Sequence, residues 1–590
     1  MAGLVGVISH DRTRPPPPEE LSALLEAYGA LRGTTHVERA SVGQWAQIAR
    51  VDGAVEGRTD AGGDSWMLSV GAIHSDGEFA TSHPELLDGQ FAAIGYDAGR
   101  DELSVVSDPF GMQALYVCER DGRTYVSTSS VALARHLRAA PDPLGLKVFI
   151  RAGYHFGPLT HWQGIERLDP ATVVAFGPER RERRVYWQPQ VDERVRSMTL
   201  AQTVDHCAEV ALDAVGRRLS AAPSVWADLT GGFDSRLIAA LLARLQVPFK
   251  TATTGAEAHP DVVLARQVAR AGGFEWQHDR MPDDWALDPA LTGTALAWGD
   301  GSLEILQLGE VLWRHERKRR SCATVVTGGG GEHVSARPWV QEFLRAGRTR
   351  RVNFDNLIRM RYLHSIDRSM LRQDPTPGVE AYFRDALGAR EQMYADELNT
   401  TKLDAIYAYK STGHFGAYRS ASEAFVRQEI PFYYRDFFNA CFSAHHRWRN
   451  GHRLQRGMIE RLGPDVAPVQ TTLGGPAQPM RPTNAHRFFP YYRDAAQATI
   501  RKLRPSHPSR GSGTPQYLAT ARSTVVRRLR AEGALDVRTM RSADLYEPRA
   551  LDGFLARAEH PDFGGWQMAG RIVTLELLLR AADPATPAAT

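Results

Sequence analysis

Short apolar runs separated by turn residues dominate the first third of the chain. The runs are rich in β-favouring side chains, and Gly, Asp and Pro stand between them. Residues 19–32 show apolar positions at helical spacing instead. The pattern predicts a layered α+β domain over residues 1–190. Its expected strands include Leu4–Ser9, Phe91–Tyr96, Leu103–Ser107, Leu115–Cys118 and Thr124–Ser127.

From about residue 198 the pattern changes, because long helical periods alternate with short apolar runs. The runs Ser224–Leu229 and Phe249–Thr253 are expected strands, each followed by a helical period. Strands that alternate with helices predict a parallel, doubly wound α/β sheet. After Val326 the strand signals fade, and Val340–Leu462 is mostly helical in pattern. Residues 198–590 are therefore expected to form an α/β domain with a largely helical C-terminal part.

Composition excludes several classes of protein. At 590 residues the chain is too long for one typical core, and its 43% hydrophobic and 24% charged residues are typical of a soluble globular protein. Its 71 basic and 68 acidic residues give no strong field, so we expect neither nucleic acid nor a membrane as partner. No signal peptide or long apolar span is evident, which predicts a cytoplasmic protein.

The four cysteines are far apart in the sequence and show no C-x-x-C spacing. They are Cys118, Cys207, Cys322 and Cys441. This distribution argues against a zinc site or a disulfide framework. We expect buried thiols.

The strongest chemical signal lies where an apolar strand runs directly into a helix. The junction reads Thr230-Gly231-Gly232-Phe233-Asp234-Ser235. Adjacent glycines let the backbone approach an anion, and the helix N-terminus offers free N–H groups and a positive dipole end. The junction therefore predicts a phosphate cradle. It is not a Walker A loop, because no Gly-Lys-Ser/Thr follows.

A second glycine cluster also follows an apolar run, and it ends in an acid. It reads Thr327-Gly328-Gly329-Gly330-Gly331-Glu332. Mg²⁺ prefers one or two carboxylates together with phosphate oxygens and waters. Asp234 and Glu332 are therefore our candidates for holding the Mg²⁺ of a Mg-ATP complex, although Glu332 could instead be a helix N-terminal charge.

The two motifs together resemble those of the asparagine synthetase superfamily, Ser-Gly-Gly-x-Asp-Ser and Ser-Gly-x-Gly-x-Asp-Glu. The resemblance implies a PP-loop ATP-pyrophosphatase domain that cleaves ATP to AMP and pyrophosphate, adenylates a carboxylate and joins it to an amine. Arg236 departs from a frequent Ser, and Glu332 departs from Asp. The positions implied to bind ATP or pyrophosphate are Thr230, Gly231, Gly232, Asp234, Ser235, Arg236, Thr253, Thr254, Gly255, Thr327, Gly328, Gly329 and Gly330.

A longer stretch ending at Asp436 resembles a helical segment of that family which closes with Glu-Ala-Arg-Val-Pro-Phe-Leu-Asp. Arg427 stands where the family has Glu, and Glu429 stands where it has Arg. Glu423 and Glu429 are therefore alternative candidates for the base toward the amine, unless both are solvated helix-face carboxylates.

The family also uses a lysine after this segment to stabilise charge on the adenylate. Residues 470–481 contain no lysine. Arg481 and Lys410 are our candidates for the fixed positive charge at the adenylate, and we group them with Asp234 as catalytic residues.

The first domain resembles the glutaminase domain of the same superfamily, through Leu87–Ala92 and Asp108–Tyr116. The resemblance implies an Ntn-hydrolase-like fold. Glutaminases of this kind expose Cys as the mature first residue, where its thiolate attacks glutamine. This chain has Ala2, so we expect the domain to be an inactive scaffold and the amine to come from a source other than glutamine.

Three activities fit a member with a silent first domain: macrolactam closure of a lasso peptide, β-lactam closure, and amidation with free ammonia. A small-molecule or peptide carboxylate in specialised metabolism is the expected substrate, with lasso cyclisation the most specific hypothesis. A precursor-peptide recognition protein or a leader peptidase would then be a partner. The alternative class is a catalytically silent nucleotide-binding scaffold, which Ala2, Arg427 and the missing lysine motivate.

Overall fold

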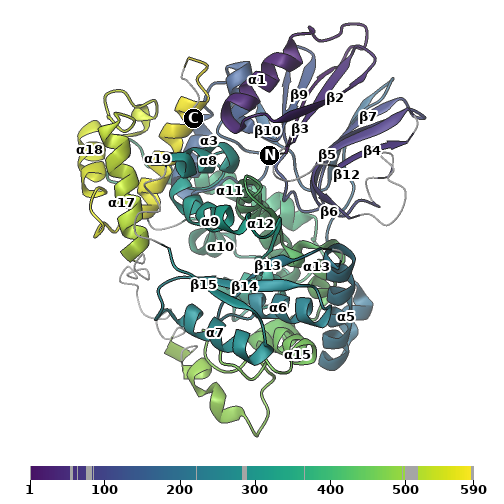
Figure 1. The fold of residues 1–590 in the computed structure, drawn as a ribbon, viewed down its shortest axis with the longest axis vertical. Coiled ribbons are helices and arrows are strands. Elements are labelled where there is room, and N and C mark those ends of the chain that lie inside the picture. The colour runs from purple at the N-terminus through teal and green to yellow at the C-terminus, as the bar shows by residue number, and fades with distance from the viewer. Residues whose placement is uncertain are drawn as a thin grey trace.

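Figure 1 shows the computed structural model, in which the N-terminal strands, the central parallel sheet and the C-terminal helices occupy different regions. The structure describes residues 2–52, 58–62, 64–74, 83, 86–220, 222–281, 289–363, 366–493, 496–497 and 516–585.

Two antiparallel sheets pack face to face in the N-terminal domain, as the apolar runs predict. Leu4 and Ile48 from one sheet share a buried cluster with Leu68 and Ile94 from the other. The first sheet has the order β10-β8-β9-β1-β3-β2 and the second β12-β11-β7-β6-β5-β4. The first comprises β1 (Gly3–Ser9), β2 (His36–Val42), β3 (Ala46–Asp52), β8 (Tyr116–Arg120), β9 (Arg123–Ser127) and β10 (Ile165–Arg167). The second comprises β4 (Arg58–Gly62), β5 (Ser65–Ile73), β6 (Gly89–Asp97), β7 (Glu102–Ser107), β11 (Thr172–Phe176) and β12 (Arg181–Val185).

Strand β1 is buried along its whole length, because helices cover the face that the second sheet leaves open. Helix α1 (Glu20–Arg32) lies on β1 and against α2 (Ser130–Leu137). Its buried residues Leu21, Leu24 and Tyr28 recur at helical spacing, which is the pattern that the sequence shows. The domain is therefore a stack of helix and sheet layers.

A five-stranded sheet, parallel throughout, forms the centre of the second domain, in the order β15-β14-β13-β16-β17. The predicted alternation of strand and helix is confirmed for its first strands. The strand β17 escapes sequence analysis, because its Arg-Gln-Glu is polar and pairing with β16 alone makes it a strand. The strands are β13 (Val225–Asp228), β14 (Phe249–Thr254), β15 (Trp276–Asp279), β16 (Thr324–Val326) and β17 (Arg427–Glu429).

Helices cover this sheet and build the remainder of the chain. Figure 1 shows α6, α7 and α15 along the sheet, and α17 and α18 grouped with the C-terminal α19. Beside the sheet lie α5 (Leu200–Leu219), α6 (Asp234–Arg244), α7 (Pro260–Gly272) and α15 (Arg453–Leu462). The other α-helices are α3 (Pro143–Ala152), α4 (Glu193–Ser197), α8 (Pro289–Gly299), α9 (Ile305–Lys318), α10 (Phe354–Arg361), α11 (Thr376–Gln392), α12 (Asn399–Ser422), α13 (Arg435–Ser443), α14 (His446–Arg449), α17 (Gln516–Ala531), α18 (Pro548–Arg557) and α19 (Trp566–Ala581). Short 3₁₀ turns include η3 (Gly331–Val334), η4 (Arg337–Glu342), η5 (Pro431–Tyr433), η6 (Asn450–His452), η7 (Ala485–Phe488) and η8 (Ala543–Leu545).

The cysteines are free and buried, as their spacing predicts. Among the helices that the structure describes, none combines the length and the apolar character needed to cross a bilayer.

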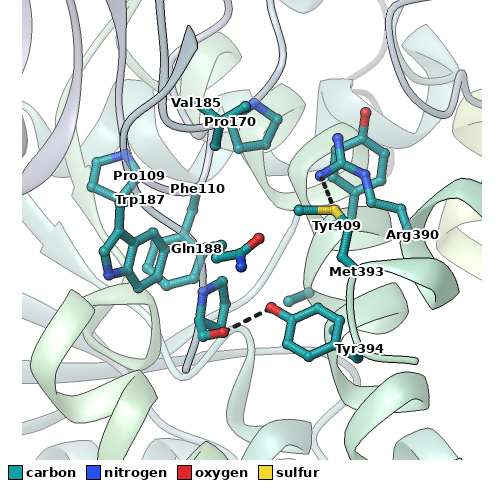
Figure 2. A pocket seen from close by; sticks show the side chains of 13 residues that line it. Pro109, Phe110, Pro170, Val185, Trp187, Gln188, Arg390, Met393, Tyr394 and Tyr409 are labelled. Carbon is teal, nitrogen blue, oxygen red and sulfur yellow. Dashed lines mark hydrogen bonds between the residues drawn. The ribbon is translucent and has the colours of Figure 1, made fainter. Parts of the chain in front are cut away.

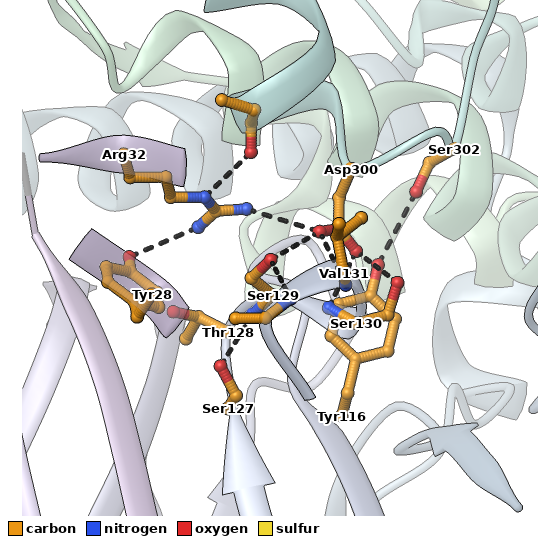
Figure 3. A network of polar contacts seen from close by, with 12 residues as sticks. Tyr28, Arg32, Tyr116, Ser127, Thr128, Ser129, Ser130, Val131, Asp300 and Ser302 are labelled. Carbon is orange, nitrogen blue, oxygen red and sulfur yellow. Dashed lines mark hydrogen bonds and ion pairs between the residues drawn. The ribbon is translucent and has the colours of Figure 1, made fainter. Parts of the chain in front are cut away.

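Asp300 joins the two domains (Figure 3). Its carboxylate accepts hydrogen bonds from Ser129 Oγ at 2.7 Å, Ser130 N–H at 2.8 Å and Ser130 Oγ at 2.6 Å, at the first turn of α2. Arg32 Nη2 of α1 lies 3.7 Å from the same carboxylate, and both side chains are buried. A carboxylate at a helix N-terminus is favoured by the helix dipole, so Asp300 stabilises α2 and the domain contact together.

A small pocket lies between the domains (Figure 2). Arg390 stacks 3.5 Å above the ring of Tyr409 and pairs with Asp169 at 3.2 Å. Tyr394 donates a hydrogen bond to the carbonyl of Pro189 at 2.8 Å. Because these polar groups already have protein partners, and no residue of either glycine cluster lines the cavity, the pocket belongs to domain packing.

The Asp300→Ala variant should lower the free energy of unfolding by about 3–5 kcal/mol, because it leaves the buried Arg32 without its carboxylate. Urea denaturation followed by circular dichroism measures the change. Asp205→Ala, which removes an exposed pair with Arg461, is the control and should stay within about 1 kcal/mol of the wild type. Equal losses in the two variants would contradict the role given to Asp300.

Candidate active site

The first glycine motif forms a tight turn between β13 and α6. Thr230 N–H donates to Ser235 Oγ at 3.0 Å, Gly232 N–H to Thr230 Oγ1 at 3.2 Å, and Gly231 N–H to Asp261 Oδ1 at 3.0 Å. A Cβ on Gly231 would lie 2.7 Å from Thr472 Cγ2, so a larger residue would collide there. The turn presents the N-terminus of α6, where the first N–H groups have no partner within the helix.

The second glycine motif packs directly onto the first. A Cβ on Gly328 would lie 2.7 Å from the nitrogen of Ser235, and one on Gly331 would lie 2.2 Å from Asp234 Cγ. Gly330 has φ +84° and faces the ring of Tyr433, where a Cβ would approach to 2.4 Å. Strands β13 and β16 are neighbours, so their carboxyl ends bring the two loops to one edge of the sheet. The two glycine motifs therefore lie side by side.

Asp234 and Glu332 share one site at this edge. Burial, and next the negative charge of Glu332, raise the pKa of Asp234 to about 7. The amide of Gln455 opposes this effect by donating to Asp234 Oδ1 at 2.5 Å. Among the described residues no group of three His, Cys, Asp or Glu side chains could hold a metal by itself. The site thus offers two carboxylates, and Mg²⁺ on a phosphate usually takes one or two from the protein.

Cationic and phenolic groups surround Glu332. Tyr407 of α12 is hydrogen-bonded to Glu332. Lys410, one turn further along α12, donates from Nζ to the carbonyl of Arg361 at 3.0 Å. Burial and then the charge of Arg361 lower the pKa of Lys410 to about 8, while Glu332 opposes them. Arg337 also influences Lys410, so three cationic side chains lie around the two carboxylates.

Sequence analysis missed Tyr407, Arg337, Arg361 and Gln455. The amide nitrogen of Gln455 contacts Asp234 and also the carbonyl of Gly331 at 3.3 Å, and its oxygen contacts His452 Nδ1 at 2.6 Å. These residues come from ordinary helical or loop sequence. Their one sequence signal is weak: Tyr407 and Lys410 are three residues apart, which places them on one helix face.

The side chain of Arg236 is used within the protein, which argues against its predicted contact with phosphate. The side chain is fully buried, and its guanidinium donates to the carbonyls of Val466 at 3.2 Å, Val469 at 2.7 Å and Gln470 at 2.8 Å. Burial, with the nearby charge of Arg456, lowers the pKa of Arg236 to about 9. Because Arg236 follows the first glycine motif on α6, it fastens residues 466–470 beside that motif.

The carboxylates of Glu423 and Glu429 are committed to structural contacts. Each is 1% exposed. Glu423 pairs with Arg419 at 2.8 Å, and Glu429 accepts from Tyr434 Oη at 2.9 Å. These contacts argue against either as the base toward an amine, because each carboxylate is buried and engaged with a neighbouring side chain.

Arg481 lies on the surface, which corrects its assignment as a charge at the adenylate. Its guanidinium makes a bidentate pair with Glu460, with both N–O distances 2.7 Å, and the side chain is half exposed. Of the two proposed cations, Lys410 is the one that the structure brings to the carboxylate pair.

The residues at the end of β14 that the sequence predicts to contact the nucleotide differ in how the protein uses them. Thr253 Oγ1 donates to the carbonyl of Leu229 at 2.7 Å and accepts from Trp276 Nε1 at 2.9 Å, so its hydroxyl is used within the protein. Thr254 and Gly255 lie at the carboxyl end of β14, which is the neighbour of β13 and its glycine motif. Their contact with a nucleotide stays a prediction.

Two family models match the chain. Residues 206–427 match the model described as "Asparagine synthase", and residues 72–187 match "Glutamine amidotransferase domain". A putative glutamine-hydrolyzing asparagine synthetase of Mycobacterium bovis is 25% identical over 254 residues, 40% of this chain and 38% of that protein. Asparagine synthetase [glutamine-hydrolyzing] 3 of Bacillus subtilis is 27% identical over 175 residues, 29% of this chain and 28% of that protein. The two matched domains and these relatives support the asparagine synthetase superfamily for this chain.

The matched stretch spans 38% or less of the length of these two relatives. Among solved structures, a glutamine PRPP amidotransferase from B. subtilis is similar at 12% identity and a TM-score of 0.22, over 47% of this chain and 65% of that chain.

The raised pKa of Asp234 predicts a pH-dependent stability. The carboxyl titrates near 3.8 when unperturbed and near 7 in the folded protein, so the folded state holds the extra proton between these values. Stability from this group is therefore lost as the pH rises through 7. Without nucleotide, Asp234→Asn should exceed the wild type in unfolding free energy by about 2 kcal/mol at pH 8, after discounting for solvent, and by nothing below pH 4. Urea denaturation across this range measures the difference, and a pH-independent advantage would contradict the assignment.

Proposed function

We propose that the chain is an ATP-dependent ligase that adenylates a carboxylate and joins the acyl group to an amine, with release of AMP and pyrophosphate. The proposal rests on the proximity of two carboxylates, those of Asp234 and Glu332. Each lies on a glycine-rich loop at the start of a helix. The family models support the same class of reaction.

The residues present fit a Mg-ATP substrate. Asp234 and Glu332 would hold Mg²⁺ on the phosphates, and the backbone of residues 230–235 would hold pyrophosphate. Bound there, Mg²⁺ would neutralise charge that otherwise builds up on the phosphates. The pKa of Asp234 then falls toward its ordinary value, because a cation favours the ionised carboxylate.

In the first half-reaction a carboxylate oxygen attacks the α-phosphorus of ATP, and the bond to pyrophosphate breaks. Lys410 is positioned to stabilise the negative charge that develops, since it lies beside Glu332 within a ring of aromatic side chains. In the second half-reaction the amine nitrogen attacks the acyl carbon, the bond to AMP breaks, and the amine loses a proton.

The amine is proposed to come from a source other than glutamine. The side chain of Ala2 is a methyl group and is 2% exposed, within the cluster between the two N-terminal sheets. No nucleophile therefore stands at the position where the related glutaminases carry Cys. The substrate that we favour is a peptide or small specialised metabolite with its own amine, as in lasso macrolactam closure or β-lactam closure, and amidation with ammonia is the alternative.

A silent nucleotide-binding scaffold is the second candidate. It is favoured by the engagement of Glu423 and Glu429 in structural pairs, which leaves neither free as a base. Pyrophosphate release separates the two candidates: turnover with any carboxylate supports the ligase, and nucleotide binding without turnover supports the scaffold.

Asp234→Ala should abolish pyrophosphate release from Mg-ATP while the protein stays folded, because it removes one of two metal-binding carboxylates. An enzyme-coupled pyrophosphate assay with candidate carboxylates, with and without ammonia, measures release, and mass spectrometry detects loss of water from a cyclised peptide. Asp205→Ala is the control and should keep full activity. Retained turnover in Asp234→Ala would remove this residue from the metal role.

Lys410→Met should reduce kcat for pyrophosphate release by about 100-fold, a magnitude typical of losing one group that stabilises transition-state charge. Arg481→Met provides a matched control, since it also deletes a long cation but lies on the surface, and it should keep wild-type kcat. The opposite ranking of the two variants would return the charge-stabilising role to Arg481.

A further inference from the structure

The segment between Glu332 and Arg361 leaves the candidate active site, forms a surface with basic and apolar side chains, and then returns to the site. It contains η4 (Arg337–Glu342), an exposed strip over residues 340–354, and α10, which ends at Arg361. Besides burial, the charges of Arg361 and Arg337 both lower the pKa of Lys410, and Glu332 raises it. The segment therefore begins and ends near Lys410 and the carboxylate pair. Whatever lies along the 340–354 strip therefore approaches the reacting groups.

Four exposed arginines of the strip have no carboxylate partner among the described residues. They are Arg345, Arg348, Arg350 and Arg351. Other exposed arginines, such as Arg194 with Asp192 at 2.8 Å and Arg368 with Asp374 at 2.7 Å, have close acidic partners, whereas none of these four neighbouring arginines has one in the part of the chain that the structure describes. Unneutralised like charges repel, so the strip is a surface that an anionic ligand would stabilise.

The two acids within the strip and next to it are already engaged. Glu342 is buried and accepts from Asn399 Nδ2 at 3.0 Å and from Asn353 N–H at 2.5 Å. Asp355 pairs with Arg384. Asn399 Oδ1 also accepts from Gly347 N–H at 2.9 Å. These bonds hold the strip in one conformation, so its surface is preformed without a ligand.

Apolar side chains are exposed on the same strip. Val340 is 38% exposed, Phe343 63% and Leu344 80%. Two cavities, of about 410 and 610 Å³, lie along it, and Leu344 and Arg348 line both. An occupant that fits must therefore bring both negative charges and apolar side chains, a combination that a peptide has and a nucleic-acid backbone lacks.

We propose that the 340–354 strip binds an acidic peptide segment with apolar side chains, and that this segment belongs to the acyl substrate. Only the second part of this proposal, that the peptide segment belongs to the acyl substrate, rests on the proposed function. Carboxylates of the peptide would pair with the four arginines, and its apolar side chains would enter the cavities around Leu344. The reacting carboxylate would then extend past Arg337 toward Asp234 and Glu332.

Fluorescence anisotropy without ATP tests the surface directly. The probe is a fluorescein-labelled decapeptide of alternating Glu and Leu, and the comparison probes are alternating Lys and Leu, alternating Glu and Ser, and a 15-nucleotide oligothymidylate. The acidic, apolar peptide should bind most tightly, and its affinity should fall with added salt because the contacts are ionic. Tightest binding of the oligothymidylate or of the Lys-Leu peptide would overturn the proposal.

Arg345→Ala/Arg348→Ala should weaken binding of the Glu-Leu peptide by about tenfold. Arg194→Ala/Arg538→Ala is the matched control, because it removes the same charge from exposed sites away from the strip, and it should bind as the wild type does. Leu344→Ser should weaken the Glu-Leu peptide and leave the Glu-Ser peptide unchanged. Equal affinity of the strip variant and its control would overturn the proposal.

The binding assay and the pyrophosphate assay test the docking surface and the ligase activity separately. Asp234→Ala should bind the Glu-Leu peptide as tightly as the wild type, because the strip does not include the carboxylate pair. Peptide binding without pyrophosphate release would sink the ligase and keep the docking surface. Pyrophosphate release without strip-dependent peptide binding would sink the docking surface and keep the ligase.

Discussion

Close contact between two glycine-rich loops is the constraint on which the candidate site depends. Backbone at Gly328 and Gly331 touches Ser235 and Asp234 so closely that a single Cβ would displace one loop from the other. The contact brings Glu332 beside Asp234, where burial, and next the repulsion between the two acids, raise the pKa of Asp234. A bound cation would compensate the charge of such a pair, so the two loops and their acids fit the proposed Mg-ATP substrate.

Buried arginines hold the elements around these loops. Arg236 binds three carbonyls of residues 466–470, and Arg449 pairs with Asp404 while it donates to the carbonyl of Ser335 at 3.1 Å. Arg236 follows Asp234 by two residues, and the backbone carbonyl that Arg449 binds lies three residues after Glu332. Their planar, multidentate hydrogen bonding can fix several backbone segments at once, which a lysine could not do.

The first domain contributes structure to the second rather than an evident reaction of its own. Its α2 is capped by Asp300, and Gln90 donates to the carbonyl of Ile430 at 3.1 Å, next to β17. The same β17 supports the second glycine motif, because Thr327 N–H donates to the carbonyl of Glu429 at 3.1 Å. A domain without a nucleophile at Ala2 can therefore be retained because the second domain packs on it.

The sequence by itself determined the local features: the alternation of strand and helix, the buried thiols, and the two glycine motifs with their acids. These features depend on backbone conformation over a few residues, so periodicity and glycine placement suffice to predict them. Only the tertiary structure decided the roles of Arg236, Glu423, Glu429 and Arg481, and it alone brought Gln455 and Tyr407 to the site. The physical reason is that a charged side chain takes its role from partners far away in the chain, and those partners are set by how the helices pack.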